Sequence, residues 1–145
     1  MQAAMEEAIA AKIRDEVPIG AVIIDKSGEI IAKAGNKTRE LKDPSAHAEI
    51  LAIREACDIA GAQRIPDYTL YVTLEPCTMC AAAISFARIR HVVIGASDPK
   101  GGGILHGAKF YEQPTCHHKP SVVHGLMEDE CGQILKDFFK DKRNL

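Results

Sequence analysis

The order of short apolar segments along the chain constrains its fold most strongly. Segments with the length and residue content of buried strands alternate with segments that repeat apolar residues at helical spacing. The expected strands cover residues 19–24, 29–34, 68–73, 91–95 and 121–124, and the expected helices cover 3–14, 46–60, 77–87 and 128–142. This alternation predicts an α/β fold, a three-layer α/β/α sandwich around a mixed sheet of about five strands, opened by an antiparallel hairpin.

The apolar residues also predict which helix faces are buried. In the first helix, Ile9 and Ile13 recur at helical spacing beside a row of alanines, so both are expected on an inward face. The segment 77–87 is apolar almost all round, which predicts a buried helix. In the last helix, we expect Phe138 and Phe139 to face the core.

Length and charge limit the possible classes of protein. The chain has 145 residues, of which 46% are hydrophobic and 26% charged, so we expect residues 1–145 to form one globular domain with its own core. The 18 basic residues against 20 acidic ones give a formal net charge of −2. A strongly basic surface over the whole molecule is therefore excluded, although a local basic patch remains possible.

The chain start and the cysteine count indicate the compartment. The first residues carry neither a basic segment nor an apolar one of the kind that directs secretion. No apolar run approaches the roughly 18 residues that a membrane span needs. An odd number of cysteines, 5, argues against a disulfide framework. We expect a cytoplasmic protein in which Cys57, Cys116 and Cys131 are core or incidental thiols.

Three potential metal ligands lie at the starts of two expected helices. Cys77 and Cys80 stand at positions i and i+3, so both sulfurs can reach one ion from the first turn of a helix, and His47 stands at the start of the other. A single pair of this spacing also fits a redox dithiol or half of a structural zinc site. Structural zinc takes four protein ligands, whereas three leave a position open for water. This ligand count favours a catalytic zinc site.

Glu49 follows His47 by two residues, a spacing that places side chains on opposite faces within a helix. Both can serve one site only where the tip of the helix points into it. The sequence 43–45, Asp-Pro-Ser, is typical of a helix start and makes this possible. Glu49 can then move protons to and from a water that zinc activates.

The motifs resemble those of a known family. His47-Ala48-Glu49 followed by Pro76-Cys77-x-x-Cys80 is a recognised signature of zinc-dependent nucleobase deaminases, and the assignment rests on that signature rather than on spacing. Further similarity, from about Glu16 to Arg143, is closest to the bacterial tRNA-specific adenosine deaminases of the cytidine/deoxycytidylate deaminase superfamily. The segments that carry it are 16–21, 44–49, 71–80, 95–98, 129–131 and 137–139.

The resemblance implies a cytidine deaminase-like fold and hydrolytic deamination of adenosine to inosine at the wobble position of a tRNA anticodon. It implies one zinc ion per subunit, an anticodon stem-loop as partner, no DNA partner, and a homodimer whose active-site cleft draws on both subunits. The C-terminal helix, 128–142, matches an element that faces RNA. By the motif match, the zinc ligands are His47, Cys77 and Cys80, the proton shuttle is Glu49, and the substrate contacts are Asn36 and Asp98.

Two segments depart from the family pattern. The family usually has Asn-His where this chain has His117-His118, and its loop usually differs from the sequence at 101–107. Cys116-His117-His118 could also suggest a second metal site, although a mobile loop fits better. Two other functions stay open: a related zinc deaminase of a free base, nucleoside or nucleotide, and a noncatalytic binding module that zinc stabilises.

Overall fold

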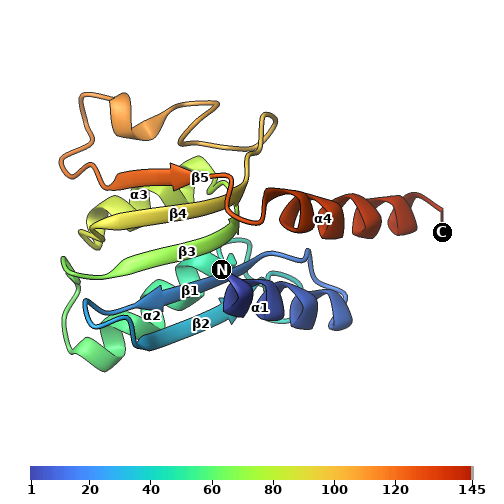
Figure 1. The fold of residues 1–145 in the computed structure, drawn as a ribbon, viewed down its shortest axis with the longest axis horizontal. Helices are drawn as coiled ribbons and strands as arrows, with labels where there is room; N and C mark the ends of the chain where they lie inside the picture. Colours follow the sequence, from blue (N-terminus) through green and yellow to red (C-terminus); the bar gives the residue numbers. More distant parts are fainter. Residues whose placement is uncertain (145) are drawn as a thin grey trace.

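A computed structural model describes residues 1–144 and contains one mixed five-stranded sheet between two layers of helices (Figure 1). The strands lie in the order β2-β1-β3-β4-β5; β1 is antiparallel to β2 and to β3, and β3, β4 and β5 run parallel. In chain order, the elements are α1 (Gln2–Ile13), β1 (Gly20–Ile24), β2 (Ile30–Gly35), α2 (Ala48–Ala60), β3 (Thr69–Leu74), α3 (Thr78–Phe86), β4 (His91–Ala96), the 3₁₀ helix η1 (Phe110–Glu112), β5 (Ser121–His124) and α4 (Glu128–Arg143).

The predicted three-layer fold is confirmed, and each expected helix and strand is present with ends within two residues of those expected. Helices α1 and α4 pack on one face of the sheet, and α2 and α3 on the other. The 19–24 and 29–34 segments form the expected antiparallel hairpin. No helix within residues 1–144 is both long and apolar enough to cross a membrane.

The strand directions bring several chain segments to one edge of the sheet. β3 and β4 are parallel, so the segments that follow Leu74 and Ala96 leave the sheet at the same edge. The first residue of β1, Gly20, pairs with the last residue of β2, Gly35, at that edge. The residues after β2, β3 and β4 therefore meet there, as is usual for ligand sites in α/β sheets.

Helix α1 corrects the expected burial of Ile9 and Ile13, whose side chains are 45% and 82% exposed. The buried row of α1 consists of alanines that lie almost against the backbone of β1. A Cβ atom at Gly20 would stand 1.9 Å from the carbonyl oxygen of Ala4, so the helix and the strand are as close as glycine allows. This close contact leaves space only for alanine side chains on the buried face of α1. The two isoleucines therefore lie on faces of the helix that are open to solvent.

Two further burial predictions were partly wrong. Met79 and Phe86 of α3 are 40% and 66% exposed, although the helix buries its opposite face fully. In α4, Phe138 is buried as expected, whereas Phe139 is 44% exposed. A helix that covers a sheet buries one stripe, and a sequence that is apolar beyond that stripe does not show which residues face outward.

Candidate metal centre and active site

The three potential ligands come together at the sheet edge because both helices begin there. His47 is the N-cap residue of α2 and Cys77 is the N-cap residue of α3, each with extended backbone dihedral angles. Cys80 follows in the first turn of α3 and is fully buried. A helix does follow the predicted start signal at 43–45: α2 begins at Ala48, and the histidine lies at its N-terminal tip.

The spacing of the three ligand atoms fits a tetrahedral zinc ion. Nδ1 of His47 lies 3.7 Å from Sγ of Cys77 and 3.5 Å from Sγ of Cys80, and the three atoms all lie within 4.8 Å of one another. Zinc–sulfur and zinc–nitrogen bonds of about 2.3 and 2.0 Å at tetrahedral angles separate sulfur from nitrogen by about 3.6 Å. The donor set, one imidazole and two thiols, is one that zinc prefers.

The two thiols have opposite protonation tendencies. The pKa of Cys77 is lowered to about 4 because the Cys80 thiol donates a hydrogen bond to its thiolate and His47 lies beside it. The pKa of Cys80 is raised by the neighbouring Cys77 sulfur and by burial. The pKa of His47 is raised by its hydrogen bond to Cys77. The site therefore favours a thiolate, the form of cysteine that binds metals.

Glu49 lies in the first turn of α2, two residues after His47, and is only 4% exposed. Burial raises its pKa to about 7, and the negative charge that Cys77 tends to carry acts in the same direction. The nearby His47 acts in the opposite direction and lowers the pKa of this carboxyl. The structure thus places a buried carboxyl directly at the potential metal site.

Asn36 follows β2 and lies beside the start of α2. Its Oδ1 accepts a hydrogen bond of 2.7 Å from the backbone N–H of Ala48, and its residue is 5% exposed. The side chain thereby satisfies one of the free N–H groups at the start of the helix that follows His47. Asn36 is therefore part of the same edge as the metal ligands.

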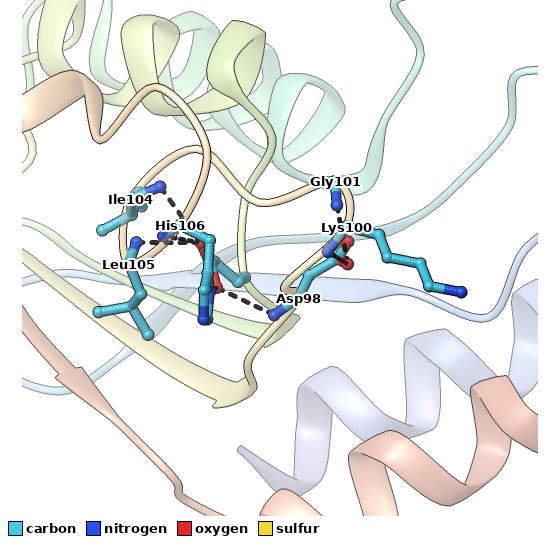
Figure 2. A network of polar contacts seen from close by, with 7 residues as sticks. Asp98, Lys100, Gly101, Ile104, Leu105 and His106 are labelled. Carbon is cyan, nitrogen blue, oxygen red and sulfur yellow. Dashed lines mark hydrogen bonds and ion pairs between the residues drawn. The ribbon is translucent and has the colours of Figure 1, made fainter.

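Asp98 follows β4 and is half-buried. Its Oδ1 accepts hydrogen bonds from the backbone N–H groups of Lys100 and Gly101, a local turn of the kind that aspartate favours (Figure 2). The structure places Asp98 at the edge that carries the ligands, and one carboxylate oxygen is engaged in shaping its own loop.

Sequence reasoning missed two buried glutamates that hold the loops around this edge. Glu16 is 1% exposed and accepts hydrogen bonds from the backbone N–H groups of Arg39 and Glu40, in the loop that leads to His47. Glu75 is 2% exposed and accepts several more from the loop after β4. The strand-like segment that ends in Glu75-Pro76 could have drawn attention to a carboxylate at a buried strand end.

Burial raises the pKa of Glu75, but hydrogen bonds from the side chain of His106 and from three backbone N–H groups of the loop together outweigh burial, and the net pKa is lowered. The carboxylate is therefore charged inside the protein. Figure 2 labels the loop residues that donate to this carboxylate, Asp98, Ile104, Leu105 and His106, and marks their hydrogen bonds by dashed lines.

The Cys116-His117-His118 segment is anchored to the protein by its backbone and one ring. The hydroxyl of Ser85 donates to the carbonyl oxygen of His118 at 2.7 Å, and Nε2 of His118 lies 2.7 Å from the carbonyl oxygen of Ile89. Within residues 1–144, the ligand set at the starts of α2 and α3 is the one group of side chains that could share a metal ion. A second metal site at 116–118 is therefore not supported.

The fold and a group of side chains that could hold a metal ion point to a deaminase, and comparison with known proteins agrees. The profile of the MafB19-like deaminase family matches residues 1–143, so the chain belongs to that family. A solved guanine deaminase from Nitrosomonas europaea, only 22% identical, shares the fold with a TM-score of 0.80 over 93% of this chain and 80% of its own.

Among the deaminases, the chain belongs with the tRNA-specific adenosine deaminases. The enzyme of that name from Agrobacterium fabrum is 59% identical over 143 residues, which cover 99% of this chain and 93% of the relative. A solved structure from work on A-to-I editing by tRNA:A34 deaminases at the wobble position is also 59% identical. It matches with a TM-score of 0.91 over 93% of this chain and 97% of its own.

Proposed function

We propose that this protein deaminates adenosine to inosine at the wobble position of a tRNA anticodon, as one zinc-dependent deaminase domain that spans residues 1–145. One observation carries the proposal: a His-Cys-Cys cluster at two helix starts with a buried carboxyl beside it. The similarity to tRNA-specific adenosine deaminases supports the choice of substrate.

The cluster would hold one zinc ion per subunit through Nδ1 of His47 and the sulfurs of Cys77 and Cys80. The sulfur–nitrogen distances of 3.5 and 3.7 Å support this assignment. Zinc bound there would supply Lewis acidity and an activated water at neutral pH. The N-terminus of α3, which carries both cysteines, stabilises a thiolate there by its free N–H groups.

Glu49 is the proposed general acid and base. Its carboxyl takes a proton from the attacking water and returns a proton to the amino group that leaves C6 of adenine as ammonia. Its position in the first turn of α2 keeps it away from solvent and next to the ligands. This environment favours proton transfer within the site over exchange with bulk water.

Asn36 and Asp98 are the proposed substrate contacts. The Oδ1 atom of Asn36 is used by the backbone of Ala48, which leaves its amide N–H groups as donors for the nucleoside. Asp98 retains Oδ2 for a donor such as a ribose hydroxyl, while Oδ1 holds its own turn. Both residues lie at the edge where the ligands meet.

We further propose a homodimer that acts in the cytoplasm on the anticodon stem-loop. The exposed apolar side chains of Met79 and Phe86 on α3 are compatible with a protein contact on that side of the sheet. Sedimentation velocity should give the mass of two chains, and an active species with the mass of one chain would contradict the dimer.

The substrate is tested by comparing the reaction rates of RNA and of small molecules in parallel. Zinc-loaded protein should form inosine in an anticodon stem-loop with A at the wobble position and not in the matched stem-loop with G there. Free adenosine, cytosine and guanine, at the same concentrations, should react at least about 100-fold more slowly, because they lack the phosphate contacts that supply most RNA affinity. Faster turnover of a free base would instead establish the rival small-molecule deaminase.

A further inference from the structure

One carboxylate organises the whole loop between β4 and η1. Oε1 of Glu75 accepts a hydrogen bond of 2.9 Å from the backbone N–H of Asp98 and lies 2.9 Å from Nδ1 of His106. Oε2 accepts from the backbone N–H groups of Ile104, Leu105 and His106, at 3.3, 2.9 and 3.1 Å (Figure 2). Both oxygens are thus surrounded by donors, four of which belong to the backbone.

The same loop is seated on the turn that carries the metal ligands. The backbone N–H of Gly103 donates to the carbonyl oxygen of Pro76 at 2.8 Å, directly before Cys77. A Cβ atom at Gly103 would lie 2.5 Å from the backbone nitrogen of Thr78, and one at Gly102 would lie 2.1 Å from Oε2 of Glu75. The contact therefore has no space for a side chain at either glycine.

We propose that Glu75 is a positioning residue for the RNA substrate. By holding both ends of the 98–106 loop through backbone N–H groups, Glu75 fixes Asp98 in a loop that also contacts Pro76, the residue before Cys77. This inference rests on the proposed function for its substrate.

The main variant is Glu75→Gln in the full-length, zinc-loaded protein. Glutamine has the same size, but its NH₂ group replaces one acceptor oxygen and would face N–H donors. We expect KM for the stem-loop to rise by about 10- to 100-fold, the size of effect expected when buried N–H donors lose their acceptor. We expect kcat at saturating RNA and zinc content to stay within about threefold. The control Glu29→Gln makes the same charge change in the hairpin turn at the opposite edge and should leave both constants unchanged.

Two further variants separate loop positioning from general damage. In Gly102→Ala, the added methyl group would collide with the Glu75 carboxylate and displace the loop, so this variant should show the same KM increase. The double variant Glu75→Gln/Gly102→Ala should have a KM no higher than that of the more affected single variant, because both changes break the same contact. His106→Ala removes one donor and leaves four backbone donors, so KM should change by less than about threefold. An effect of His106→Ala equal to that of Glu75→Gln would overturn the proposal, since the side-chain pair and not the backbone anchor would then matter.

Hydrogen exchange tests the loop without reference to RNA. In Glu75→Gln, the amide hydrogens of residues 98 and 104–106 should exchange at least about tenfold faster than in the wild type, while those of β3 stay protected. Unchanged exchange, or a lowered kcat and zinc content at constant KM, would refute the positioning role. If the Glu75→Gln loop exchanged faster but the wild type formed no inosine, the proposed function would be refuted. The role of Glu75 in positioning RNA would then be refuted with it.

Discussion

Replacing Glu49 with glutamine should lower kcat for inosine formation by about 10²- to 10⁴-fold while the protein keeps its zinc. A positioned acid and base contributes a factor of this size, and glutamine cannot carry the proton from the water to the leaving amine. Glu49 is buried beside the three potential ligands but is not one of them, so the variant should still bind zinc. The measurement is single-turnover inosine formation together with zinc content per chain.

The matched control for this variant is Glu55→Gln, since Glu55 lies exposed on the same helix, α2. Its turnover should equal that of the wild type. If Glu49→Gln kept more than about a tenth of the wild-type rate, another group would have to move the proton. If the variant lost its zinc, Glu49 would act as a ligand and the assignment of roles would be wrong.

Replacing Cys80 with serine should abolish both zinc binding and turnover. Cys80 is fully buried and supplies one of two sulfurs within reach of His47, so its loss leaves two ligands, too few for a tightly held ion. Turnover should fall to the uncatalysed background, a larger effect than that of the Glu49 variant, because the water is then no longer activated.

A readout of binding that does not depend on activity comes from thermal unfolding. A ligand that binds only the folded state stabilises it by an amount that grows with its concentration. Zinc should therefore raise the Tm of the chelator-treated wild type and of the control Cys57→Ser, whose thiol lies away from the site on α2. It should not raise the Tm of Cys80→Ser. An equal rise in all three proteins would contradict the ligand assignment.

The ligands could be predicted from the sequence because their chemistry is local. The i, i+3 spacing of Cys77 and Cys80 and the helix-start residues before His47 depend on a single turn of backbone, and the structure has each helix begin where those signals lie. Their meeting across some 30 residues follows from the α/β alternation, which sends the strand ends to one edge of the sheet.

The anchoring glutamates could not be predicted in the same way. Glu75 and Glu16 are bound by backbone N–H groups of loops more than 20 residues distant, and a backbone N–H has no signature in the sequence. The exposure of Phe139 and Ile13 could not be predicted for a related reason. The width of the helix face that touches the sheet depends on how closely the helix and the sheet pack, and glycines in the strands determine that distance.

Zinc K-edge X-ray absorption on the purified protein shows which atoms surround the metal and whether one of its positions is open to solvent. We expect two sulfur atoms, one imidazole nitrogen and one lighter atom from solvent around the metal. In any Cys80→Ser protein that can be forced to bind zinc, we expect one sulfur fewer. A centre with four protein ligands, or one that keeps both sulfurs in that variant, would show that the cluster of His47, Cys77 and Cys80 is not an open catalytic site.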